Sequence, residues 1–160
     1  MDIIPADQSH AESIWRIFSA VVANGDTYVF DPAIGREDAL AYWLAAGTHA
    51  FVAVDAGEVL GTYILKANQP GLGSHVANAG YMVSGAARGR GVGSAMCEHS
   101  LAMARDLGFA AMQFNIVVST NGVAVKLWQK HGFQIVGTLP KVFRHQTLGL
   151  VDAFVMHRFL

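Results

Sequence analysis

The spacing of apolar residues along the chain changes repeatedly between a helical period and an alternating or continuous strand-like one. In the first predicted helix the apolar residues recur at helical spacing, at Ile14, Ile17, Phe18, Val21 and Val22. The preceding Ser9-His-Ala-Glu12 has the pattern of a capping box, so we expect this helix to begin there. A second helix is expected over residues 36–45, where Leu40, Trp43 and Leu44 are apolar.

Strand-like segments alternate with helices through the rest of the chain. Strands are expected over residues 49–55, 59–66, 75–83, 112–118, 133–139 and 153–159, the first two joined by a tight Ala56-Gly57 turn. Helices are expected from Val92 to a stop at Gly108, and from Asn121 to a stop at Gly132. With a strand before the first helix, the order is β-α-α-β-β-β-α-β-α-β-β. This order predicts an α/β (α+β) fold, and 160 residues without a linker or repeat predict one domain over residues 1–160.

The segment Arg88-Gly-Arg-Gly-Val-Gly93 lies between an expected strand and an expected helix. Three glycines without Cβ atoms allow a ligand to approach the backbone, so that successive N–H groups can converge on one point. The start of a helix adds unpaired N–H groups and the positive end of the helix dipole. Arg88 and Arg90 add positive charge. We therefore interpret residues 88–94, called the glycine loop below, as a pyrophosphate-binding segment.

The spacing of these glycines argues against two other phosphate-binding motifs. A dinucleotide fingerprint Gly-x-Gly-x-x-Gly that began at Gly89 or Gly91 would end at position 94 or 96, where the chain has Ser94 and Met96. Its acidic residue about 20 positions later is also missing, because Asp106 lies inside the expected helix. A Gly-x4-Gly-Lys-Ser/Thr loop needs a lysine that the segment lacks. A nucleotide-dependent oxidoreductase is thus disfavoured.

Composition narrows the choice of partners. The formal net charge is −1 and no basic stripe is present, so nucleic acid and acidic membrane surfaces are not expected partners. Neither a signal peptide nor an apolar run long enough to span a membrane is recognised, which predicts a soluble, cytoplasmic protein. Cys97 is the only cysteine and the histidines lack metal-ligand spacing, so no metal is expected. Charged residues make up only 14% of the chain, and we expect a homodimer in which a second copy covers part of the surface.

The glycine loop matches the pattern Arg/Gln-x-x-Gly-x-Gly/Ala, which resembles the acetyl-coenzyme A (acetyl-CoA) loop of the GCN5-related N-acetyltransferases (GNAT). Asn121-x6-Trp128-x3-Gly132-Phe133 resembles a second block of that family. The resemblance implies a mixed sheet of six to seven strands with about four helices, splayed between its fourth and fifth strands. It implies acetyl-CoA as co-substrate, bound by Met82, Val83, Arg88, Gly89, Arg90, Gly91, Val92, Gly93, Ser94, Asn121 and Trp128.

Position 128 departs from the family pattern, which has tyrosine there, often as the acid that protonates the departing thiolate. An indole N–H is a hydrogen-bond donor but not a usable acid. Catalysis does not require such an acid, because a thiol with a pKa of roughly 8.5 can leave as the thiolate and take a proton from water. The sequence also allows purely structural uses, with Asn121 as a helix N-cap and Trp128 as a core residue.

A narrower resemblance covers residues 24–155. Its blocks look like those of the fungal acetyltransferases that N-acetylate proline analogues such as azetidine-2-carboxylate, and they are Gly25-Asp-Thr-Tyr28, Tyr42-Trp43, residues 60–68, residues 74–80, Phe114-Asn115 and Lys126-Leu-Trp128. This resemblance implies a small amino or imino acid as the amine substrate. It implies that Asn78, Tyr81, Asn115 and Ile116 bind the substrate, and that Asn78 and Asn121 are the catalytic residues. Asn78 and Asn115 could instead satisfy a bulge or a turn.

The implied reaction is direct transfer of acetyl to an amine within a ternary complex. The amine must lose a proton, and the candidate bases are His75, His145, Asp152 or a water held by Asn78. A free N–H near Val83 would polarise the thioester oxygen. A non-catalytic acetyl-CoA-binding module is the competing function, favoured by the lack of an obvious base and by Trp128. A GNAT acting on another class of amine is a further alternative.

Overall fold

The computed structural model describes residues 1–160 and contains one seven-stranded sheet of order β1-β2-β3-β4-β5-β7-β6. The strands are β1 (Asp2–Pro5), β2 (His49–Asp55), β3 (Glu58–Ala67), β4 (Val76–Val83), β5 (Ala111–Val118), β6 (Gln134–His145) and β7 (Gly149–Phe159). The α-helices are α1 (Ala11–Ala23), α2 (Arg36–Trp43), α3 (Val92–Asp106) and α4 (Gly122–Lys130). The predicted order of elements and the mixed sheet are confirmed. No helix is long and apolar enough to cross a membrane.

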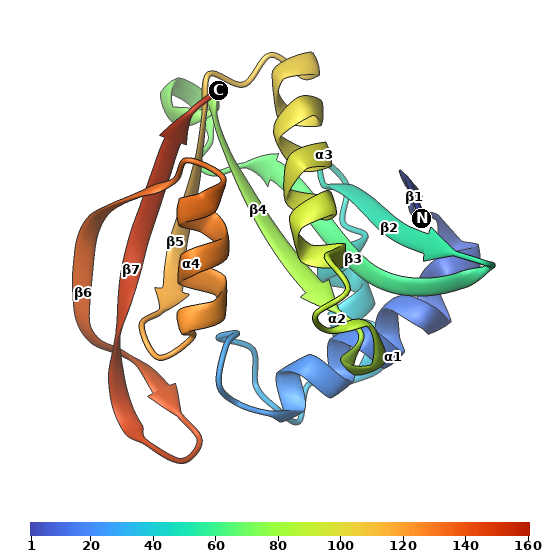
Figure 1. Cartoon of the computed structure of the whole chain (residues 1–160), viewed down its shortest axis with the longest axis horizontal. Helices are drawn as coiled ribbons and strands as arrows, with labels where there is room; N and C mark the ends of the chain where they lie inside the picture. The colour runs from blue at the N-terminus through green and yellow to red at the C-terminus, as the bar shows by residue number, and fades with distance from the viewer.

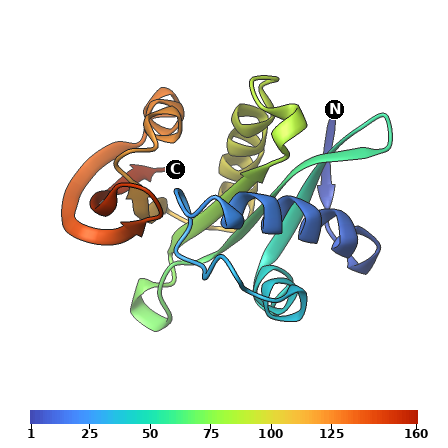
Figure 2. The same cartoon turned by 90° about the horizontal axis from the view of Figure 1, so that it is seen from below.

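The helices cover the two faces of the sheet in pairs. Helices α1 and α2 lie on one face, while α3 and α4 lie on the other (Figures 1 and 2). Successive side chains of β3 point to opposite faces of the sheet. Tyr63 and Leu65 pack in the core under α3, and Ile64 packs in the core under α1 and α2. This alternation follows from the two-residue period of a strand, and it explains why β3 reads as a continuous apolar run.

The sheet parts between its fourth and fifth strands, as the resemblance implied. The parallel strands β4 and β5 pair only at Val76↔Ala111 and Ala77↔Met112, and they then diverge (Figure 1). The Asn78 Nδ2 atom donates to the Gln113 carbonyl oxygen at 2.9 Å, directly beyond the last paired residues. Strand β5 pairs in regular register with β7 up to Phe114, and the register shifts before it resumes at Val117. The shift leaves the backbone of two residues of β5 outside the regular ladder.

Two local predictions were wrong. The capping box does not start at Ser9: the Asp7 side chain accepts from the Ser9 N–H, a 3-10 turn (Gln8–His10) follows, and α1 begins at Ala11. Strands β6 and β7 extend well beyond residues 133–139 and 153–159, and their pairing continues to His145↔Gly149. Their register shifts near Pro140 and Lys141, where Lys141 has φ of 51°, so the strand signal of the sequence is interrupted there.

A buried hydrogen-bond chain joins α2 to the sheet and supports a stability prediction. Trp43 Nε1 donates to Thr62 Oγ1 at 2.9 Å, and Thr62 Oγ1 donates to the Phe51 carbonyl at 2.8 Å. Both side chains are fully buried. Thr62→Val should lower the free energy of unfolding by about 1–3 kcal/mol, because it leaves the indole N–H without an acceptor. Urea titration measures the change, and Thr62→Ser, which keeps the hydroxyl, is the control. An equal loss in both variants would contradict the assignment to the hydrogen bond.

Candidate active site

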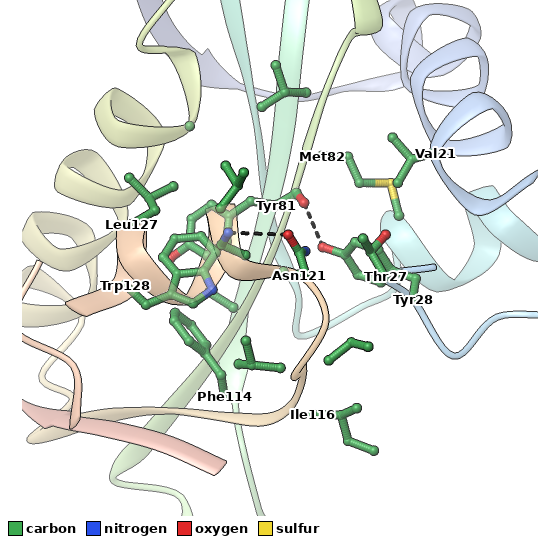
Figure 3. A pocket seen from close by; sticks show the side chains of 18 of the residues that line it. Val21, Thr27, Tyr28, Tyr81, Met82, Phe114, Ile116, Asn121, Leu127 and Trp128 are labelled. Carbon is green, nitrogen blue, oxygen red and sulfur yellow. Dashed lines mark hydrogen bonds between the residues drawn. The ribbon is translucent and has the colours of Figure 1, made fainter. Parts of the chain in front are cut away.

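A cavity of about 1050 Å³ lies where β4 and β5 part. It is lined by residues of β4, the glycine loop, the N-terminal end of α3, β5, α4 and the loop between α1 and α2. Figure 3 shows side chains from both halves of the sheet meeting around it. All but one of the predicted site residues line this cavity, and Arg90 is the exception. Its guanidinium forms an ion pair with Asp55 at 3.3 Å.

The backbone of the glycine loop fits a pyrophosphate group. Gly89 and Gly91 have φ of 75° and 80°, and a Cβ atom added to either would meet no atom within 4 Å. Gly91 is the N-cap of α3 and provides no side-chain cap. The backbone N–H groups of Gly91, Val92, Gly93 and Ser94 form no hydrogen bond within the protein. Four free N–H groups at a helix start, with Arg88 also lining the cavity, make this end a favourable place for an anion.

Ser94 connects the two helices on this side of the cavity. Its Oγ atom lies 2.8 Å from Nε2 of His131, the residue that follows α4, and the His131 carbonyl accepts a hydrogen bond from the Arg158 guanidinium. Burial lowers the pKa of His131, so its imidazole stays neutral to lower pH than an exposed histidine. The sequence assigned Ser94 to the cofactor. The structure shows that its side chain is already bonded to His131 at the end of α4, which leaves its backbone N–H for a ligand.

The second motif places Asn121 and Trp128 against the cavity. Asn121 Oδ1 accepts from the Ala124 N–H at 3.2 Å, so the asparagine is the N-cap of α4 (Figure 3). The Trp128 ring packs against Tyr81 and Phe114, with a centroid separation of 4.9 Å to each. Its indole N–H has no hydrogen-bond partner in the protein and is not sealed from solvent. Asn121 is thus the helix N-cap and Trp128 a packed aromatic residue, as the structural alternatives in the sequence suggested. The Asn121 Nδ2 atom forms no hydrogen bond within the protein.

Tyr81 contributes its ring and backbone to the cavity rather than its hydroxyl. The hydroxyl oxygen lies 2.6 Å from Ser100 Oγ in the core under α3. Burial raises the pKa of the Tyr81 phenol well above its usual value, so the group does not ionise in the neutral range. The Tyr81 carbonyl accepts a hydrogen bond of 2.7 Å from the hydroxyl of Tyr28, a residue of the α1–α2 loop (Figure 3).

The predicted substrate residues of β5 lie at the irregular part of that strand. Asn115 and Ile116 fall in the register shift, where β5 has no regular partner in β7. Asn115 Nδ2 donates to Asn68 Oδ1 at 2.7 Å, and Asn115 Oδ1 accepts from Gln113 Nε2 at 3.0 Å. The amide of Asn115 therefore links β5 to Asn68, the residue that follows β3. Backbone groups of this segment, rather than that amide, are the ones free to meet a ligand.

None of the three candidate bases lines the cavity. His145 Nδ1 accepts from the N–H groups of Thr147 and Leu148 at 3.2 Å, and Asp152 accepts from the Lys141 N–H at 2.9 Å. The one acidic residue that does line the cavity is Asp26. Sequence reasoning missed it, although it lies in the block Gly25-Asp-Thr-Tyr28 that carries part of the family resemblance.

Known proteins resemble this chain in sequence and in structure. It is 34% identical over 100 residues to N-acetyltransferase aca1 of Schizosaccharomyces pombe, a match covering 61% of this chain and 47% of that protein. It is 32% identical over 113 residues to the L-amino acid N-acetyltransferase AaaT of Escherichia coli, a match covering 70% of this chain and 68% of that protein. A GCN5-related N-acetyltransferase structure from Kribbella flavida superimposes with a TM-score of 0.95 at 45% identity, covering 99% of this chain and 97% of that one.

The match to the Schizosaccharomyces pombe protein thus spans about half of that relative's length. The family model itself covers more of the present chain. The model of the acetyltransferase (GNAT) family matches residues 12–133, which include nearly all of α1, the helices α2 to α4, the glycine loop and the strands β2 to β5. Together with the splayed sheet and the free N–H groups at the start of α3, this match shows that the chain belongs to the acetyltransferase (GNAT) family.

Proposed function

We propose that this protein is an acetyl-CoA-dependent N-acetyltransferase that acts on a small amino or imino acid by direct transfer in a ternary complex. The observation that carries the proposal is the asymmetry of the cavity. One end offers the free N–H groups of residues 91–94 and Arg88, which suit a pyrophosphate. The other end offers amides, hydroxyls and irregular backbone at Asn78, Tyr28 and residues 115–116, which suit a small zwitterion.

The register of β4 provides hydrogen-bond donors inside the cavity. Ser84 N donates to Leu60 O and Asn68 N to Val76 O, so the alternation of the antiparallel ladder turns the backbone groups of Tyr81 and Val83 away from β3. Beyond the splay these groups have no β5 partner. Acetyl-CoA, when bound, supplies a thioester as the acyl donor. With acetyl-CoA bound, the N–H groups of Tyr81 and Val83 would donate to the thioester oxygen, where negative charge develops during attack by the amine.

A cofactor-binding module without catalysis is the competing function, because Trp128 replaces the tyrosine of the family pattern. Calorimetric titration with acetyl-CoA, followed by a thiol-release assay with a panel of amines, separates the two functions. Binding without thiol release on any amine would favour the module. Transfer to an aminoglycoside or polyamine, with none to amino or imino acids, would keep the acetyltransferase assignment and overturn the substrate class.

We also propose that a second copy of the chain covers part of the surface. The edge strand β6 and the start of β7 expose apolar side chains, among them Val136, Val142 and Leu150. A long edge strand with exposed apolar residues is a site at which two chains can pair.

Gly93→Val should raise the KM for acetyl-CoA at least tenfold while the fold persists. Gly93 has an ordinary φ, so the backbone accepts a side chain, but a Cβ atom there lies 3.3 Å from Leu127 Cδ2 and would narrow the space between α3 and α4. Loss of one charge-assisted hydrogen bond to the pyrophosphate corresponds to about 1.5–3 kcal/mol. Calorimetry with coenzyme A and thermal melting of the same sample measure affinity and folding. Unchanged affinity in a folded variant would remove the pyrophosphate assignment.

Trp128→Phe should keep most of the turnover number. The indole N–H has no partner in the protein, and the aromatic contacts with Tyr81 and Phe114 survive in a phenyl ring. If the thiolate leaves without a protein acid, the indole is needed only for packing. Steady-state kinetics and urea titration check the two effects separately. A loss of several hundredfold in kcat at unchanged stability would show that the indole takes part in the chemistry.

Asn78→Ala should lower kcat/KM for the amine by about 10- to 150-fold and leave acetyl-CoA affinity unchanged. The panel is azetidine-2-carboxylate, proline, 4-hydroxyproline and methionine analogues. Asn78 Nδ2 is bonded to Gln113 O, so its Oδ1 atom is the one available to the substrate. If acetyl-CoA affinity and stability fall together with activity, Asn78 acts by holding β4 to β5 and not by binding the amine.

A further inference from the structure

The loop between α1 and α2 is held by hydrogen bonds on both sides of Asp26, to the β6–β7 turn and to β4. On one side, the Gly25 carbonyl accepts from the Gln146 N–H at 2.9 Å, which docks the β6–β7 hairpin on the loop. Gly25 allows this approach, because it has φ of 60° and a Cβ atom there would lie 2.9 Å from Gln146 Cβ. On the other side, the Tyr28 hydroxyl donates to the Tyr81 carbonyl of β4 at 2.7 Å. Asp26 is therefore held between a contact to β6–β7 and a contact to β4.

The carboxylate of Asp26 makes no contact that stabilises the fold. It accepts no hydrogen bond from the protein. It also forms no ion pair, because the acidic partners in the four ion pairs are Asp55 (twice), Asp7 and Glu12. Asp26 nevertheless lines the cavity and is only partly exposed. An aspartate that lines a cavity and has no partner within the protein is available to bind a cation from solution.

The other charged residues of the cavity belong to different elements. Arg88 lies in the glycine loop, and Lys126 and Lys130 lie on α4. The remaining titratable residues of the lining are tyrosines, at positions 28, 42 and 81. Burial raises the pKa of both Tyr28 and Tyr81, so these two phenols stay neutral and cannot take a proton from an amine. Asp26 is the one anionic group available to a positively charged amine.

We propose that Asp26 binds the ammonium group of the substrate and accepts its proton, which makes it the catalytic base that the sequence did not reveal. This inference rests on the proposed function. The step is balanced: an N–H bond of the ammonium breaks, the Asp26 carboxylate becomes a carboxylic acid, and the nitrogen lone pair is freed. The neutral amine attacks the thioester carbonyl, its second proton leaves as the amide forms, and the thiolate takes up a proton. The carboxylate of an amino acid would then lie toward residues 115–116, away from Asp26.

The pH profile of kcat/KM tests the proton transfer. If free enzyme with ionised Asp26 reacts with the ammonium form, kcat/KM for proline or azetidine-2-carboxylate is flat between about pH 6 and 8. In Asp26→Asn the substrate must arrive as the neutral amine, so kcat/KM should rise about tenfold per pH unit over that range. Since an alkyl amine with a pKa of roughly 10.4 is less than about 0.1% neutral at pH 7, the variant should lose on the order of 1000-fold or more in kcat/KM near that pH.

Calorimetry tests the ammonium contact without relying on turnover. In the presence of coenzyme A, the wild-type protein should bind proline more tightly than cyclopentanecarboxylate, which has the same ring size and carboxylate but no nitrogen. Asp26→Asn should bind the two about equally, and Asp26→Glu should restore part of the preference. Glu37→Gln, which removes an exposed carboxylate from the first turn of α2, is the matched control and should behave as wild type.

The outcomes distinguish the inference from the proposed function. If an amine of the panel is acetylated and Asp26→Asn retains a flat pH profile and the wild-type preference for proline, the Asp26 assignment is overturned while the acetyltransferase stands. If a different amine proves to be the substrate, the same pH comparison with that amine decides the role of Asp26. If no amine is acetylated and proline binds no better than cyclopentanecarboxylate, both proposals are overturned.

Discussion

The divergence of β4 and β5 is the constraint on which the rest of the structure depends. Two residue pairs hold β4 and β5 together at one end, and beyond them the backbone groups of Tyr81 and Val83 have no partner in β5. A buried N–H or carbonyl without a partner costs about 1–3 kcal/mol, so an open sheet of this kind needs compensation. The compensation comes partly from other elements, since Tyr28 donates to the Tyr81 carbonyl and Asn78 to the carbonyl of Gln113. What remains unpaired faces the cavity and is available to a ligand.

Packing keeps the two halves of the sheet apart and in place. The rings of Tyr81, Phe114, Trp128 and Phe133 form a continuous contact from β4 to β5 and α4, with neighbouring centroids 4.3–6.4 Å apart. Ser94 and His131 join α3 to α4 on the same side. Because aromatic rings are large and stiff, this cluster fixes the width of the opening without closing it. Trp128 therefore has a packing role in this cluster that does not depend on an acidic hydroxyl.

Much of the fold could be read from local signals in the sequence. Apolar spacing located the helices and most strands, and the helix stop signals at Gly108 and Gly132 correspond to left-handed glycines in the structure. The glycine loop was recognised because its chemistry is local: its φ angles, its free N–H groups and the start of α3 all belong to one short segment. Asn121 was likewise recognised as an N-cap from its place in the chain. Such features depend on a few consecutive residues, so the sequence by itself determines them.

The tertiary structure decided which distant residues share the cavity. Asp26 looked like an ordinary loop residue until contacts from Gln146 and Tyr81 fixed its loop over the splay. Arg90 looked equivalent to Arg88, yet its side chain pairs with Asp55, at the end of β2. The candidate bases His145 and Asp152 lie in the β6–β7 hairpin outside the cavity lining, where their side chains accept hydrogen bonds from nearby N–H groups. These outcomes depend on pairs of residues far apart in the chain, and no local pattern encodes such a pairing because it is set by how the whole sheet packs.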